Sequence, residues 1–154
     1  KNIQIDIVGW ENNAEKPFEK KLITYAKSLG ISNNVTFHGK KKLGSDLNQY
    51  YRNSDIYVLP SYHEGFPRTI WEAMANKLPV VTTSVGAIPF YLKHEKSAYI
   101  VESRNVDALT EALTLCIDDY ELRSEIIKNG FDLAKENSLA IQTFKIIKYI
   151  QNKL

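Results

Sequence analysis

The sequence predicts an α/β fold: about five parallel strands in a doubly wound sheet, with helices on both faces and a helical C-terminal tail. Two observations carry this prediction. Apolar, β-branched runs alternate with segments of helical spacing, which is typical of strands that pair in parallel through right-handed crossovers. In addition, residues 55–61 contain an unbroken apolar run, as expected for a strand that is covered on both faces.

Each expected strand is an apolar run with a recognisable boundary. The first run stops at Gly9 and the second at Gly39, while Pro79 stands at the start of the fourth, where a proline is tolerated. In chain order, the expected strands are residues 3–8, 34–39, 55–61, 78–84 and 97–102.

The expected helices are marked by apolar spacing and by residues that favour helix ends. Gly30 stands where a C-terminal cap glycine belongs, and Ser45 and Asn105 are candidate N-caps. In chain order, the expected helices are residues 14–29, residues 45–52, a helix that opens at Pro67 or Arg68 and carries Glu72, a turn or short helix over residues 87–95, and residues 106–119, 120–136 and 139–152.

Composition narrows the class of protein. The 154 residues are 44% hydrophobic and 25% charged, which fits a single soluble globular domain over residues 1–154. A net charge of +2 gives no reason to expect a nucleic-acid partner. The one cysteine, Cys116, cannot form an internal disulfide and favours a reducing, cytoplasmic setting. Because the chain starts on a strand without an initiator methionine, we expect a piece of a longer, two-domain protein.

The loop after the third strand has the content of a ligand site. In open parallel sheets, ligands bind at the carboxyl ends of strands, and a helix N-terminus there offers amide groups to an anion such as a diphosphate. Gly65 would let the backbone approach a ligand closely, and Glu64 and Glu72 could accept hydrogen bonds from sugar hydroxyls. Taken by itself, the spacing of the two glutamates favours solvated surface acids. The expected ligand therefore depends on the surrounding pattern.

That surrounding pattern resembles a known enzyme family. The stretch SYHEGFPRTIWEAMANKLPVVTTSVGAIPFYL has a glutamate, seven residues, a second glutamate followed by Ala-Met-Ala, and then a Pro-Val-Val strand. It resembles the signature of the retaining family 4 glycosyltransferases of the GT-B fold, the glycosyl transferases group 1 domain. The resemblance extends from Ile3 to about Lys135. It implies the C-terminal, Rossmann-like half of a GT-B fold, which binds the donor nucleotide-sugar.

The resemblance also implies roles for residues of the central motif. Glu64, the catalytic candidate, would contact the hydroxyls of the donor sugar, and Glu72 would bind the ribose hydroxyls. The residues implied in binding the sugar and the diphosphate are Glu64, Gly65, Phe66, Pro67, Arg68 and Thr69. Those implied in bordering the base are Gly9, His38, Gly39 and Lys40.

The implied reaction is transfer of a hexose from a UDP- or GDP-sugar to a glycan or a lipid-linked acceptor. The acceptor would be bound mainly by an N-terminal domain outside this chain, and the family's upstream basic pair also has no counterpart here. The chain alone is therefore expected to be inactive. No metal or other cofactor is expected, since the three histidines have no metal-ligand spacing. The expected location of the full-length enzyme is the cytoplasm, with peripheral association at the cytoplasmic face of a membrane as one option.

Two departures and two alternatives accompany this interpretation. The stretch from Gly86 to Phe90 lacks the second glycine and the acid of a common Gly-Gly-Ile-Pro-Glu form, and Ser97-Ala98-Tyr99 replaces a frequent Asn-Gly pattern. One alternative is a GT-B sugar-nucleotide epimerase. The other is a non-enzymatic α/β binding module, although neither a receiver-type acidic cluster nor a G-x-G-x-x-G or P-loop motif is present.

Overall fold

The structure is a computed structural model that describes residues 2–153, and its chain divides into two compact units after Tyr50. The expected five strands are present and all of their pairings are parallel, so the α/β class is confirmed. The strands are hydrogen-bonded in two sheets, with two strands in the first unit and three in the second. The single-domain organisation stays a prediction.

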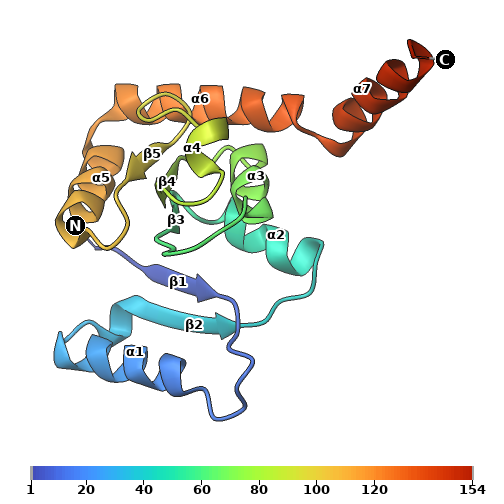
Figure 1. Cartoon of the computed structure of the whole chain (residues 1–154). Coiled ribbons are helices and arrows are strands. Elements are labelled where there is room, and N and C mark those ends of the chain that lie inside the picture. The colour runs from blue at the N-terminus through green and yellow to red at the C-terminus, as the bar shows by residue number, and fades with distance from the viewer. Residues whose placement is uncertain (1, 154) are drawn as a thin grey trace. The chain divides into compact units, whose positions relative to one another are not determined.

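The first unit is built on a two-stranded parallel sheet (Figure 1). Its elements are β1 (Ile5–Val8), α1 (Pro17–Ser28), the 3-10 helix η1 (Ser32–Asn34), β2 (Val35–Gly39) and most of α2 (Ser45–Arg52). Ile7 is opposite Phe37, but the register then shifts, so that Val8 is opposite Gly39. This irregularity lies at the carboxyl ends of the strands, where the sequence predicts residues that border a ligand.

Helix α1 starts later than predicted, at Pro17 instead of residue 14. Proline suits the first turn of a helix because its missing N–H would have no helical partner there. The Glu11 carboxylate accepts hydrogen bonds from the backbone N–H groups of Phe18 (3.0 Å) and Glu19 (3.2 Å), so a distant side chain serves the helix start. The predicted C-terminal cap is confirmed: Gly30 has a φ of +71°, in the left-handed region that glycine adopts without strain.

Helix α2 begins at Ser45 itself. The predicted capping role of Ser45 is wrong, because the serine lies inside the first turn. The carbonyl of Gly44 accepts the first helical hydrogen bond, from the N–H of Asn48 at 2.9 Å. By contrast, Asn105 is a true N-cap, and its side chain accepts a hydrogen bond from the N–H of Ala108 at 2.9 Å.

The second unit has a three-stranded parallel sheet with strand order β3-β4-β5. Successive strands are neighbours, so each intervening segment crosses over the sheet. The strands are β3 (Tyr57–Leu59), β4 (Val80–Thr83) and β5 (Tyr99–Val101). The helices are α3 (Arg68–Ala75), α4 (Ile88–Tyr91), α5 (Val106–Asp118), α6 (Tyr120–Glu136) and α7 (Leu139–Gln151).

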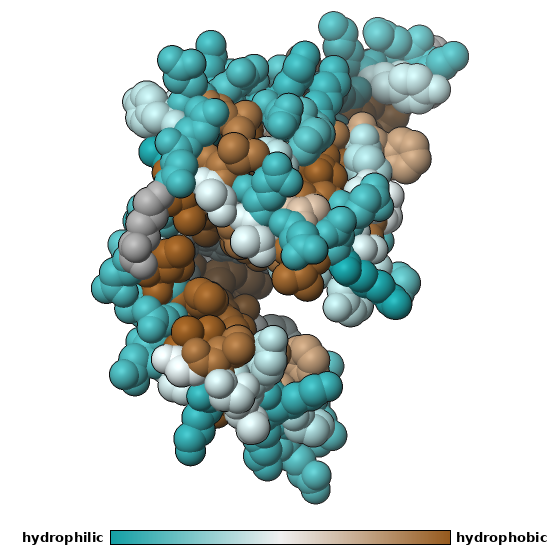
Figure 2. Space-filling model, turned by 90° about the vertical axis from the view of Figure 1, so that its left-hand side faces the viewer, coloured by the Kyte–Doolittle hydropathy of each residue, from teal (hydrophilic) through white to brown (hydrophobic). Residues whose placement is uncertain are grey.

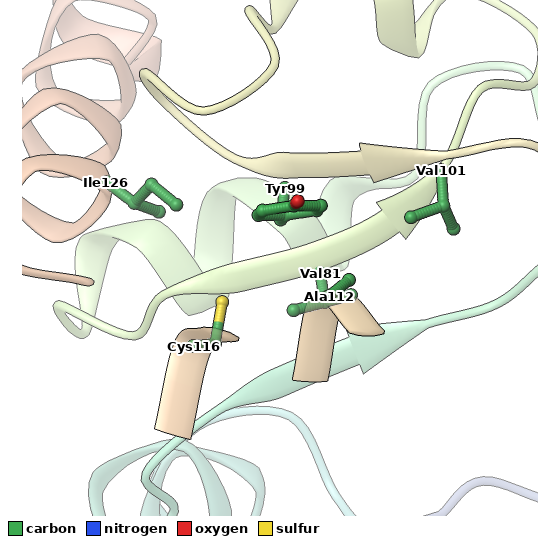
Figure 3. Close-up of a cluster of buried hydrophobic side chains, with 6 residues drawn as sticks. All are labelled: Val81, Tyr99, Val101, Ala112, Cys116 and Ile126. Atoms are coloured by element: carbon green, nitrogen blue, oxygen red, sulfur yellow. The ribbon is translucent and has the colours of Figure 1, made fainter. Parts of the chain in front are cut away.

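Strand β4 lies at the centre of this sheet and of the core. All four of its side chains are buried, and because successive side chains point to opposite faces, both faces of β4 are covered. Val81 belongs to a buried cluster with Ala112 and Cys116 of α5 and Ile126 of α6 (Figure 3). The sheet therefore packs against helices α5 and α6.

Helices α3 and α6 pack closely at a glycine. A β-carbon at Gly130 of α6 would lie 3.3 Å from the Met74 side chain and 3.1 Å from the Ser97 carbonyl oxygen.

Helix α7 extends away from this packed region (Figure 1) and contains no buried residue. Among residues 2–153, no helix combines the length and the apolar character needed to cross a membrane.

Apolar side chains also reach the surface (Figure 2). In the first unit, the side chains of Ile3, Ile5 and Phe18 are 51%, 47% and 61% exposed. The first run of the chain, with its β-branched residues, is thus a strand whose side chains are not fully buried.

Candidate functional site

The loop from Ser61 to Pro67 follows β3 and is anchored to β4. The Thr83 hydroxyl, at the end of β4, donates a hydrogen bond to the Ser61 carbonyl oxygen at 2.6 Å. The Ser61 hydroxyl in turn donates to Glu64 Oε1 at 2.7 Å. Glu64 is therefore oriented by its own loop, and its side chain remains partly accessible.

A second loop, which follows β4, contacts the backbone of Glu64 and Gly65 in the first loop. The N–H of Ala87 donates to the Gly65 carbonyl oxygen at 2.9 Å. Gly86 has a φ of +56°, and a β-carbon there would overlap the Glu64 carbonyl oxygen and lie 2.5 Å from the Gly65 carbonyl oxygen. Only glycine fits this contact, so Gly86 sets the backbone position of Glu64 and Gly65.

Helix α3 begins directly after this loop. Its N-cap, Pro67, makes no side-chain capping bond, so the N-cap side chain accepts nothing from the first amide groups of the helix, and the N–H of Ile70 donates to the Pro67 carbonyl oxygen at 3.1 Å. Together with the positive end of the helix dipole, such groups favour an anion. Phe66 precedes α3, and its ring stacks on the Trp71 ring of that helix, with 4.6 Å between the two centroids.

Glu72 lies one turn into α3 and is held from two sides. The Tyr51 hydroxyl donates to Glu72 Oε2 at 3.0 Å, and Arg68 Nε donates to Oε1 at 3.0 Å. Burial raises the pKa of Tyr51 above its ordinary value, and the hydrogen bond to Glu72 raises it further. Burial also raises the pKa of Tyr57, while a hydrogen bond with Thr69 opposes that shift.

The residues predicted to border a base gather within the first unit, at the carboxyl ends of β1 and β2. The N–H of Gly9 donates to the Gly39 carbonyl oxygen at 3.1 Å. His38 Nε2 lies 2.6 Å from Asp6 Oδ1, and its Nδ1 lies 3.3 Å from the Tyr50 hydroxyl. The fourth of these residues is Lys40, whose ammonium lies 4.3 Å from the centroid of the Trp10 ring.

The structure thus brings the predicted residues together in two groups. Gly9, His38, Gly39 and Lys40 belong to the first unit, and the segment from Glu64 to Glu72 belongs to the second. Within residues 2–153, no three His, Cys, Asp or Glu side chains are grouped as metal ligands would be. Independence from a metal stays a prediction.

Sequence reasoning missed three residues that shape the second group. Ser61, Gly86 and Tyr51 contact the motif but were not predicted to belong to the site. The sequence does point to Gly86, since the stretch that begins at this residue matches part of the common Gly-Gly-Ile-Pro-Glu form. Nothing in the sequence points to Tyr51, because its spacing in a helix is that of an ordinary packing residue and its partner Glu72 is 21 positions away.

A comparison with protein families explains the motif. A sequence model of the family described as glycosyl transferases group 1 matches residues 1–133. The chain belongs to this glycosyltransferase family. Its relatives include Protein CapJ of Staphylococcus aureus, which is 31% identical over 142 residues, or 92% of this chain and 34% of CapJ.

Solved structures of GT-B glycosyltransferases have the same fold as this glycosyltransferase domain. The C-terminal domain of the group 1 family protein LpcC from Francisella tularensis is 30% identical, with a TM-score of 0.77 over 87% of this chain and 69% of that one. Anabaena HepE, solved with UDP-glucose, is 23% identical, with a TM-score of 0.83 over 98% of this chain and 41% of HepE. The chain spans about a third of the length of the first curated relatives that it matches.

Proposed function

We propose that this chain is the donor-binding domain of a retaining glycosyltransferase, which transfers a hexose from a UDP- or GDP-sugar to a glycan or a lipid-linked acceptor. One observation carries the proposal. In a chain of the glycosyl transferases group 1 family, two oriented carboxylates flank the uncapped start of helix α3. Carboxylates accept hydrogen bonds from hydroxyls, whereas helix amides attract phosphate oxygens, and a nucleotide-sugar presents hydroxyls on both sides of a diphosphate.

In this proposal the diphosphate lies at the start of α3, near the backbone of Arg68 and Thr69. The departing nucleoside diphosphate gains negative charge as the sugar leaves, and fixed dipoles aimed at that charge lower the barrier. Gly65 has no neighbouring atom within 4 Å of the place a β-carbon would take, so its exposed backbone is open to a ligand. Phe66 and Pro67 offer backbone groups beside it.

The two glutamates have separate proposed roles. Glu64, whose Oε1 is held by Ser61, contacts hydroxyls of the transferred sugar. Glu72 accepts hydrogen bonds from the ribose hydroxyls. For the first unit taken by itself, the family resemblance implies that Gly9, His38, Gly39 and Lys40 border a base, mainly through backbone atoms. UDP is the nucleotide to test first, because HepE has this fold and was solved with UDP-glucose.

Calorimetric titration with UDP, GDP and UDP-glucose tests the binding role. We expect at least one nucleoside diphosphate to bind, and Glu72→Ala to weaken its affinity about tenfold, as for loss of hydrogen bonds to a charged group. Glu95→Ala is a matched control, because Glu95 is an exposed acid of the same unit with a side chain that is 55% exposed. If none of these ligands binds, the chain is a module of another kind.

Product analysis tests the chemistry of the full-length enzyme. With an isotopically labelled donor, NMR shows whether the label reaches an acceptor and whether the anomeric configuration is retained. A labelled product that remains a nucleotide-sugar with one inverted hydroxyl would instead identify an epimerase. We expect the 154-residue chain to bind the donor but to transfer no sugar, because it spans only about a third of the length of the first curated relatives that it matches.

A further inference from the structure

The Glu72 carboxylate is held by two very different donors. Tyr51, which donates to Oε2, is only 6% exposed. Arg68, which donates to Oε1 from one turn earlier in α3, has a side chain that is 71% exposed. An exposed ion pair is weakened by solvent and salt, so Arg68 restrains Glu72 only loosely. The hydroxyl of the buried residue Tyr51 is the firmer anchor.

Tyr51 is itself fixed by its surroundings. Its ring packs against Tyr57 of β3, with 5.9 Å between the ring centroids. Because burial raises the pKa of Tyr51, the phenol keeps its proton at neutral and moderately alkaline pH and stays a hydrogen-bond donor. A packed ring with a protonated hydroxyl is a rigid support for a carboxylate that would otherwise rotate about three side-chain bonds.

The hydrogen bonds from Tyr51 and Arg68 still leave room for a ligand. Each carboxylate oxygen can accept two hydrogen bonds, and Tyr51 and Arg68 each occupy one position on a different oxygen. As far as residues 2–153 are concerned, one position therefore remains on Oε1 and one on Oε2. This remaining pair matches the two neighbouring hydroxyls of a ribose, each of which donates one hydrogen bond.

We propose that Tyr51 is a positioning residue for ribose recognition: its hydroxyl fixes Glu72 so that both carboxylate oxygens face the 2′- and 3′-hydroxyls of the nucleotide. This inference rests on the proposed function, because it needs Glu72 to bind the ribose. Tyr51 does not touch the nucleotide. Its contribution is to hold the carboxylate in the binding geometry before the ligand arrives, which lowers the entropy cost of binding.

The test compares a nucleoside diphosphate with its 2′,3′-dideoxy form. The 154-residue chain is titrated with UDP and with 2′,3′-dideoxy-UDP, and with the GDP pair if GDP binds more tightly. The ratio of the two dissociation constants measures ribose discrimination. We expect a ratio of about ten or more for the unaltered chain, about one for Glu72→Ala and an intermediate value of about three for Tyr51→Phe.

Two further variants separate positioning from general damage. Tyr99→Phe removes the hydroxyl of another tyrosine of the second unit, one that is 8% exposed, and should leave the ratio unchanged. In the Glu72→Ala background, Tyr51→Phe should have no additional effect on the ratio, because the group that it positions is absent. Thermal unfolding of each variant shows that it is folded at the titration temperature.

The outcomes distinguish this inference from the proposed function. A ratio that falls in Tyr51→Phe but not in Tyr99→Phe supports the positioning role. If Glu72→Ala loses discrimination while Tyr51→Phe keeps all of it, the positioning role is wrong and the ribose role of Glu72 stands. If the unaltered chain does not discriminate between the two nucleotides, the ribose role fails and the inference fails with it.

Discussion

The backbone of Gly86 is packed directly against the carbonyl group of Glu64. A β-carbon at Gly86 would lie 2.9 Å from the Glu64 carbonyl carbon and would overlap its oxygen. The loop after β4 therefore determines the position of the loop after β3.

Gly86→Ala should both destabilise the second unit and displace the Glu64 loop. Alanine is strained at a φ of +56° and would also clash, so we expect the free energy of unfolding to fall by about 1–3 kcal/mol. Chemical denaturation measures this change, and amide NMR shifts of Glu64 and Gly65 report the displacement. Gly30→Ala is the control, since Gly30 has a φ of +71° but no atom within 4 Å of the added carbon. Equal effects of the two variants would show that the contact with Glu64 is unimportant.

Glu64→Ala should separate recognition of the sugar from recognition of the nucleotide. Under the proposed function, the variant loses the extra affinity for UDP-glucose over UDP, about tenfold, and binds UDP as before. Calorimetry with both ligands gives the two values. His63→Ala alters the exposed neighbour and is expected to change neither. Equal weakening of both ligands by Glu64→Ala would place Glu64 on the nucleotide or in the stability of the loop.

Cys116 should make the folded chain sensitive to alkaline pH. The thiol is fully buried, and burial raises its pKa above the ordinary value of 9.0. As pH rises through this ordinary value, the unfolded chain loses the thiol proton more readily than the folded chain does, so the free energy of unfolding falls. Denaturation at several pH values measures this slope, and Cys116→Ala should reduce it. A thiol reagent that labels the folded chain as fast as the chain in urea would contradict the burial of Cys116.

The periodic parts of the fold could be predicted because their signals are local. The unbroken run over residues 55–61 does form a strand, β3, but the prediction that both of its faces are covered is wrong, because Val58 is 36% exposed. The strand that is buried on both faces is β4, the central strand of its sheet. Asn105 caps α5 as predicted. The start of α1 was missed because the acceptor for its first amides comes from Glu11, several residues before the helix. The division of the strands into two sheets has no local signal, since strand pairing is decided by tertiary contacts.

The candidate site was predictable only where the family motif covers it. Glu64, Glu72 and the start of α3 are expected from the motif and lie in one unit, while their roles stay predictions. The supports of these residues come from elsewhere in the chain: Gly86 is 22 positions from Glu64, and Tyr51 is 21 positions from Glu72. Both spacings are longer than any helix or strand of the described residues, so no periodic pattern within one element could show these contacts.

The way in which the Ser61–Pro67 loop is held has an evolutionary consequence. Both anchoring bonds, from the Thr83 hydroxyl and from the Ala87 N–H, end on backbone oxygens, which every amino acid supplies. The side chains of Tyr62 and His63 are exposed between these anchors. Substitutions there can accumulate without moving the main chain, so new specificities can arise at the tip of the loop while its scaffold is inherited unchanged.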